Sequence, residues 1–82
     1  MAVFLGVHKL PPEMTEDEAR EGWESYKKSA TEKGLRPIGA VVSIEKGFAY
    51  CQTEAESRDQ VRDAHQAVEI PLEDVVEVEA LS

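Results

Sequence analysis

Two helix-start signals divide this chain of 82 residues into a regular alternation of elements. The first signal pairs Thr15 with Glu18, and the second pairs Ser57 with Gln60. In such a capping box, the hydroxyl of the first residue accepts a hydrogen bond from the backbone of the last, whose side chain reaches back. Because each box fixes where a helix begins, the segments around the two helices are left to form strands.

Apolar residues follow both signals at helical spacing. After the first box the stripe consists of Ala19, Trp23, Tyr26 and Ala30, and Gly34 supplies a left-handed stop. Acidic residues crowd the start of this segment and lysines crowd its end, as the helix dipole favours. The pattern predicts a helix with one buried face.

The second helix is expected to bury a similar stripe. Its apolar face consists of Val61, Ala64, His65 and Val68, and Pro71 then interrupts the pattern. Runs rich in strand-forming residues occupy residues 3–9, 37–44, 48–53 and 75–80. Residues 45–47 are predicted to form a short hairpin connection between the second and third runs.

The order of elements is therefore β-α-β-β-α-β, which predicts an α+β fold of the ferredoxin-like class. We expect an antiparallel four-stranded sheet, with room for a short extra strand, and two helices on one face. A chain this short forms one core, so residues 1–82 are expected to be a single domain. The other face of the sheet would be bare and apolar, and another subunit commonly packs on such a face.

The net charge of −8, from 17 acidic against 9 basic residues, argues against two classes of partner. Nucleic acid and anionic membrane surfaces both attract clustered Lys and Arg, so we expect neither. Excess acid favours solubility and attracts cations. A single cysteine cannot form an internal disulfide, and the apolar N-terminus lacks the basic region of a signal peptide. No apolar run approaches membrane-spanning length, so we expect a cytoplasmic protein.

Three side chains carry metal-binding chemistry, because imidazole and thiolate are donors that first-row transition metals prefer. Cys51 lies on the third predicted strand, His65 on the apolar side of the second helix, and His8 near the end of the first strand. Their spacing matches no general metal motif. Cys51 and His65 are therefore either packing residues or ligands. His8 is either a solvated rim histidine or a ligand in an open surface site completed by carboxylates and waters.

A family resemblance is carried by Tyr50-Cys51, Glu54-Ala55, Val61-Arg62, Ala64-His65, Pro71 and Glu77-Val78. In these residues the chain resembles DUF4242, a small bacterial family, and its short actinobacterial nickel-binding, nickel-responsive member. The resemblance covers most of the chain and implies a ferredoxin-like fold, a homodimer, and binding of Ni²⁺ for sequestration or detoxification. By this resemblance, Cys51 and His65 are the positions that match the metal-binding members of the family. Many relatives carry a further histidine in the second strand, which residues 39–42 lack, so His8 would have to contribute elsewhere.

We therefore expect a nickel-binding protein of metal homeostasis, not an enzyme, with surface sites that use His8, His65 and Cys51 on a homodimer. Incomplete coordination at such sites would let metal bridge molecules and promote self-association. Two alternatives stay open. One is a small cofactor-free enzyme, similar to isomerases or monooxygenases, with Cys51 or His65 as acid or base. The other is a non-metal module for small-molecule sensing or interaction.

Overall fold

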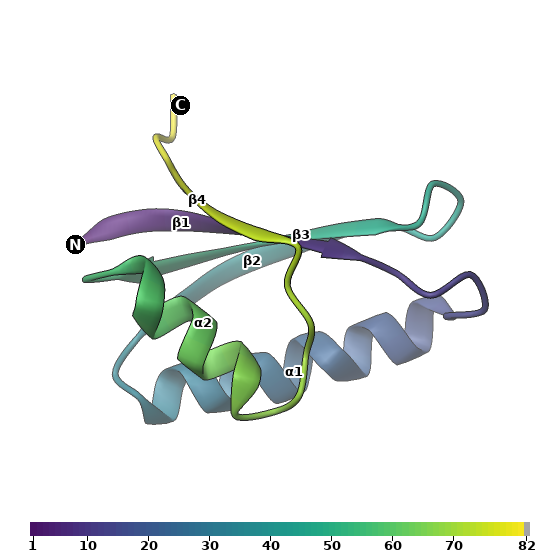
Figure 1. Cartoon of the computed structure of the whole chain (residues 1–82), viewed down its shortest axis with the longest axis horizontal. Coiled ribbons are helices and arrows are strands. Elements are labelled where there is room, and N and C mark those ends of the chain that lie inside the picture. Colours follow the sequence, from purple (N-terminus) through teal and green to yellow (C-terminus); the bar gives the residue numbers. More distant parts are fainter. Residues whose placement is uncertain (82) are drawn as a thin grey trace.

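The structure is a computed structural model that describes residues 1–81, and it confirms the predicted order of elements. The strands are β1 (Ala2–Lys9), β2 (Arg36–Ser43), β3 (Phe48–Ala55) and β4 (Asp74–Val78). They form one antiparallel sheet in the order β2-β3-β1-β4. Helices α1 (Glu16–Glu32) and α2 (Arg58–Gln66) cover one face of this sheet (Figure 1). The extra strand that we allowed for is absent from residues 1–81.

Both capping boxes form as predicted. The Thr15 hydroxyl accepts a hydrogen bond of 3.1 Å from the backbone N–H of Glu18, whose carboxylate accepts one of 2.9 Å from the backbone of Thr15. Ser57 and Gln60 make the same reciprocal pair at the start of α2. Gly34, with a φ of 81°, follows the end of α1 in the left-handed conformation that glycine adopts without strain.

The strand register shows which side chains face the helices. Gly6 on β1 and Ala40 on β2 both pair with Cys51 of β3, and Gly6 also pairs with Val75 of β4. These four residues therefore share one face of the sheet, because side chains alternate along each strand. Cys51 and Val75 are buried there.

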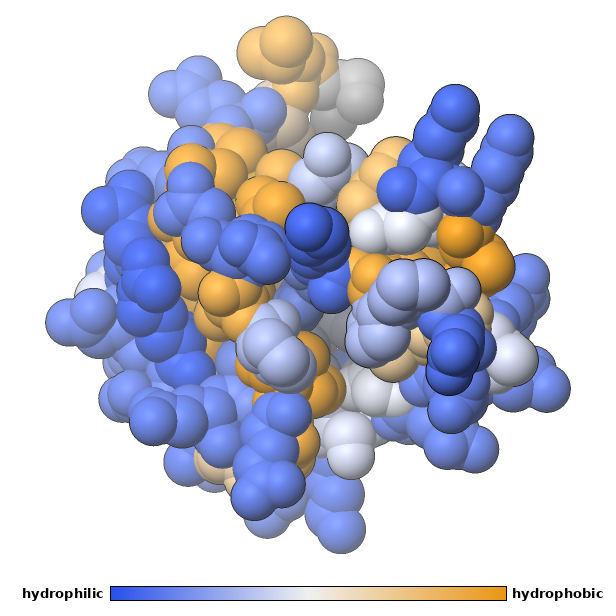
Figure 2. Space-filling model, turned by 45° about the vertical axis from the view of Figure 1, so that its right-hand side comes forward, coloured by the Kyte–Doolittle hydropathy of each residue, from blue (hydrophilic) through white to orange (hydrophobic). Residues whose placement is uncertain are grey.

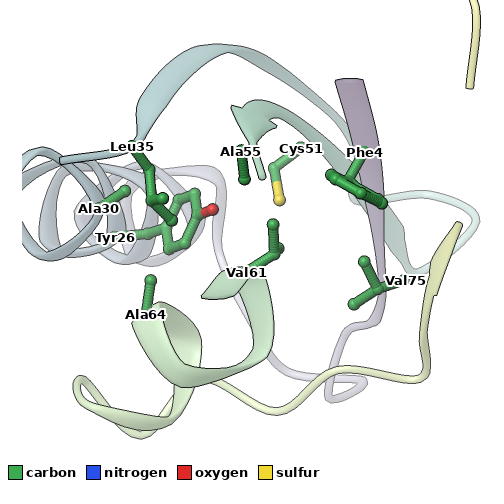
Figure 3. Packing of buried hydrophobic residues seen from close by; sticks show 9 residues of the cluster. All are labelled: Phe4, Tyr26, Ala30, Leu35, Cys51, Ala55, Val61, Ala64 and Val75. Atoms are coloured by element: carbon green, nitrogen blue, oxygen red, sulfur yellow. The ribbon is translucent and has the colours of Figure 1, made fainter. Parts of the chain in front are cut away.

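A small core lies between the covered face and the helices. Figure 3 shows its members: Phe4, Tyr26, Ala30, Leu35, Cys51, Ala55, Val61, Ala64 and Val75. Two buried hydrogen bonds tie α1 to its neighbours. The Tyr26 hydroxyl lies 2.6 Å from Oγ1 of Thr53, and the Ser29 hydroxyl donates to the carbonyl oxygen of Ala64 at 2.8 Å.

The opposite face of the sheet carries no helix (Figure 1). The register places on it Val3, Leu5, Val7, Val41, Phe48, Tyr50, Val76 and Val78. Val41 is 63% exposed and Val76 is 37% exposed. The predicted bare face is therefore present, and it is largely apolar, although Lys9, Gln52, Glu54 and Asp74 also lie on it. In residues 1–81, neither helix has the length and apolar character needed to cross a membrane.

Candidate metal centre

Three candidate ligand atoms lie together on the covered side of the sheet. Nε2 of His8 and Nε2 of His65 each lie 3.4 Å from Sγ of Cys51, and the three ligand atoms lie within 4.8 Å of one another. They come from β1, β3 and α2 respectively. The structure thus brings together all three residues that the sequence analysis singled out.

His8 does not form the separate surface site that we expected. It pairs with Ala49 of β3 and lies on the same face as Gly6, so its side chain is directed to the helix side of the sheet. It is half-buried, whereas Cys51 and His65 are 4% and 1% exposed. The candidate centre is therefore an internal cluster. Cys51, which could have been a packing residue only, lies between the two imidazoles.

The hydrogen bonds made by the outer ring nitrogens fix the tautomer of both neutral imidazoles. Nδ1 of His8 lies 2.9 Å from the carbonyl oxygen of Pro71, and Nδ1 of His65 lies 2.8 Å from that of Val61. A carbonyl oxygen only accepts hydrogen bonds, so each Nδ1 carries the proton and donates it. Each Nε2 of a neutral ring then presents its lone pair towards the sulfur. Metal-bound histidines commonly have this arrangement, with the outer N–H held by a backbone carbonyl.

Burial keeps all three groups uncharged at neutral pH. Desolvation lowers the pKa of His65 to about 4, lowers the pKa of His8, and raises the pKa of the Cys51 thiol to about 11. The single S–H of Cys51 can donate to only one of the two Nε2 atoms at a time. Two lone pairs thus compete for one proton. A cation that replaces this proton would satisfy both.

Gly6 provides the space that the thiol occupies. A Cβ on Gly6 would lie 2.7 Å from Sγ of Cys51, 3.2 Å from Leu72 and 3.5 Å from the ring of His65. The first distance is shorter than any normal van der Waals contact. The cluster therefore needs a residue without a side chain at this point of β1.

Tyr26 of α1 holds the other side of the His65 ring. The two rings are stacked, with centroids 3.8 Å apart and planes inclined by 22°. The Tyr26 hydroxyl is in turn fixed by its hydrogen bond to Thr53, two residues beyond Cys51 on the same face of β3. The imidazole is thus positioned by its own helix, by α1 and by the sheet.

The donor set fits a first-row transition metal. A four-coordinate ion with ordinary bond lengths separates nitrogen and sulfur ligands by about 3.1 to 3.6 Å, and both N···S distances here are 3.4 Å. The two Nε2 atoms, which lie within 4.8 Å of one another, must be no more than about 4.2 Å apart to share one ion, so binding requires at most a small movement of the rings. Two imidazoles and a thiolate are donors suited to nickel, copper or zinc. The cluster found among residues 1–81 contains no carboxylate. Three protein ligands leave at least one coordination position for another molecule.

A pocket of about 400 Å³ opens at this cluster and includes all three residues in its lining. Its other walls come from the β1–α1 loop, the first half of α1, the β2–β3 pair and the segment after α2. Figure 2, in which the right-hand end of Figure 1 is brought forward, shows apolar residues on either side of a narrow hollow. The cluster is therefore buried by the protein but can be reached from one side.

Similarity to known proteins identifies the family of this chain. The sequence model of the family described as "Nickel responsive protein SCO4226-like" matches residues 4–78, a range that includes all three cluster residues. The chain belongs to this family. The resemblance seen in the sequence is thereby confirmed.

The fold is also that of a solved structure. The crystal structure of SCO4226 from Streptomyces coelicolor A3(2) matches with a TM-score of 0.88, covering 99% of this chain and 100% of that chain at 20% sequence identity. At this identity the likeness shows the ferredoxin-like fold alone. No curated protein matches the chain.

We predict that Gly6→Ala destabilises the protein by about 1–3 kcal/mol, because the added methyl group must displace the thiol of Cys51. Urea denaturation measures this change. Gly39→Ala is the matched control, since Gly39 lies in the same sheet but has nothing within 4 Å of an added Cβ. Equal losses in the two variants would contradict the close contact at Gly6.

We also predict that the metal-free protein loses stability as the pH falls from 6.5 to about 4. Folding lowers the pKa of His65 from 6.5 to about 4. The contribution of this residue to the free energy of unfolding is therefore complete above pH 6.5 and is lost as the pH falls through about 4. The resulting decrease in the free energy of unfolding is about 3 kcal/mol. The groups that face its ring are His8, Cys51 and Tyr26. Of these, His8 also has a pKa that burial lowers.

Denaturation at a series of pH values, in the presence of a chelator, checks this dependence. His65→Gln cannot gain the buried charge, so its stability should fall much less over the same interval. Parallel curves for the wild type and the variant would show that His65 is not the titrating group.

Proposed function

We propose that this protein binds a nickel ion through Nε2 of His8, Sγ of Cys51 and Nε2 of His65, and that it sequesters the metal without catalysing a reaction. One observation carries the proposal. Both imidazoles are held by backbone carbonyls so that their unprotonated nitrogens converge on a single thiol. The description of the family as nickel responsive supports nickel over the other metals that this donor set would accept.

The protonation chemistry of the three residues suits reversible metal binding. Both rings are neutral at pH 7, so neither loses a proton when metal enters. The Cys51 thiol, whose pKa is raised to about 11, must give up its proton to become a ligand. The thiolate then supplies the one negative charge of the cluster. Metal and proton compete for the same sulfur, so we expect acid to favour release.

The raised pKa of Cys51 also distinguishes this proposal from a nucleophilic enzyme. Thiol catalysis requires the thiolate, and reactive cysteines have a pKa below the free value of about 8.5. Desolvation moves Cys51 in the opposite direction. This environment therefore suits a metal ligand, because Cys51 would become charged only when it binds a cation.

We further propose that the bare face of the sheet binds a second copy of the chain. It carries an apolar row across β2, β3 and β1, in which Val41 pairs with Tyr50 and Tyr50 with Val7, and this row ends at Asp74 of β4. Tyr50 also packs near Phe48, with ring centroids 5.0 Å apart. For a domain of this size, covering such a row adds apolar burial that its own helices cannot supply. Because the nickel ligands converge within one chain, the dimer does not need metal to form, unlike the metal-bridged association expected for surface sites.

Nickel titration of the metal-free protein tests the site. We expect a thiolate-to-nickel charge-transfer band in the near ultraviolet, with release of about one proton per ion at pH 7. Cys51→Ser should abolish the band. Because each variant removes a direct ligand, Cys51→Ser and His8→Gln should each weaken nickel binding at least about a hundredfold.

Glu79→Gln is the control for non-specific attraction of cations to an acidic surface, and it should bind nickel as the wild type does. Folding of every variant is verified by circular dichroism. Unchanged affinity in both Cys51→Ser and His8→Gln would overturn the ligand assignment.

Sedimentation of Val41→Lys tests the dimer. Val41 lies on the bare face, so a lysine there places an unpaired charge in the interface, and we expect a monomer at concentrations where the wild type is dimeric. Val42→Lys makes the same charge change one residue away, on the covered side of β2, and should remain dimeric. A dimeric Val41→Lys protein would exclude this face as the interface.

A further inference from the structure

The pocket beside the cluster is more than the entrance that a metal ion needs. Its volume of about 400 Å³ lies within the range of about 300–1,000 Å³ that is typical of small-molecule sites. A hydrated metal ion fills only a small part of such a space. Contact with a hydrated ion would not bury the apolar surface of the pocket walls.

Small residues on two facing elements create this space. Ala19 and Gly22 of α1 line one side, and Ala40 and Ala49 of the sheet line the other. A Cβ added to Gly22 would meet nothing within 4 Å. A domain of 82 residues has little apolar burial to spare, so a cavity left open between its helix and its sheet is unfavourable unless a ligand fills it.

The walls are suited to an aromatic body. Trp23 and Tyr26 line the pocket from α1, with ring centroids 6.0 Å apart, and Tyr26 stacks on the cluster residue His65. Two of the acidic residues in the lining already have partners. Glu16 pairs with Arg20 at 2.7 Å, and Glu18 belongs to the capping box. Glu69 and Lys9 also contribute to the lining, but most of it is apolar, so a neutral aromatic ring fits these surroundings better than an ion does.

The cluster forms part of the wall of this pocket and offers three ligands. His8, Cys51 and His65 all contribute to the lining, so a further coordination position of a bound ion faces the cavity. No carboxylate belongs to the cluster within residues 1–81. The remaining donor must come from water or from whatever occupies the pocket.

We propose that the pocket binds a small aromatic nitrogen heterocycle whose ring nitrogen coordinates the nickel ion, while its apolar body lies between α1 and the sheet. The inference rests on the proposed nickel site and extends it. The bound species is then a nickel complex with an organic ligand, and the protein selects that ligand by the shape and apolar character of the pocket.

The test uses the nickel-loaded protein with two probes, imidazole and 4-phenylimidazole. Both offer the same donor nitrogen, but only the second has an apolar body to bury. Changes in the nickel absorption bands, with calorimetry, report binding. We expect 4-phenylimidazole to bind at least about tenfold more tightly than imidazole, because the buried phenyl ring adds apolar contact. Without nickel, the same probe should bind at least about tenfold more weakly.

Gly22→Phe should fill the pocket and reduce the affinity for 4-phenylimidazole at least about tenfold, with nickel affinity unchanged. Phenylalanine is more favourable than glycine inside a helix, so the change should not unfold α1. Gly22→Ala is the matched control, because it makes a similar change in helix propensity but adds only one methyl group. It should bind the probe as the wild type does.

The outcomes separate the two proposals. If nickel produces no signal in the wild type, both the nickel site and this inference fail. If nickel binds but 4-phenylimidazole binds no more tightly than imidazole, only this inference fails. It also fails if Gly22→Phe binds the probe as well as Gly22→Ala does, or if the probe binds equally well without nickel.

Discussion

A buried histidine without charge is the constraint on which the rest of this structure depends. His65 packs against the core residues Tyr26 and Cys51, with 1% of its surface exposed. Its two ring nitrogens must both find partners inside the protein, because an unpaired buried polar atom is costly. The carbonyl oxygen of Val61 satisfies one nitrogen, and the other is left to the thiol of Cys51. The same requirement that stabilises the core therefore creates a lone pair directed at a sulfur.

The sequence predicted the elements well because their signals are local. The capping boxes at Thr15 and Ser57 and the glycine at position 34 depend only on neighbouring residues, and all three formed as expected. The predicted strands differ from the observed ones by a few residues at their ends. The order of the elements then left the ferredoxin-like arrangement as the natural solution.

The position of His8 could not be predicted in the same way. Apolar residues occupy both faces of β1, where Phe4 faces the helices and Leu5 faces the bare side, so the alternation does not show which set is covered. That choice depends on the register between β1 and β3, which is a tertiary property. Gly6 was the available signal. A glycine two residues before His8 marks a close approach on the same face, but the sequence does not reveal that the approaching group is Cys51.

The sheet also separates the two proposed interactions. Tyr50 and Cys51 are neighbours on β3, yet one belongs to the bare apolar face and the other to the cluster. The pocket lies mainly between α1 and the covered side of the sheet, although Val41 and Tyr50 of the bare face also contribute to its lining.

The three donors come from points of the chain that are far apart, at positions 8, 51 and 65. An ion held by all three would tie β1, β3 and α2 together, and the unfolded chain offers no such arrangement. Ligands that bind only the folded state stabilise it in proportion to the logarithm of their concentration. For a small, marginally stable domain, metal supply would then set how often the chain opens to proteases. The amount of folded protein would then rise with the concentration of whichever metal the three residues bind.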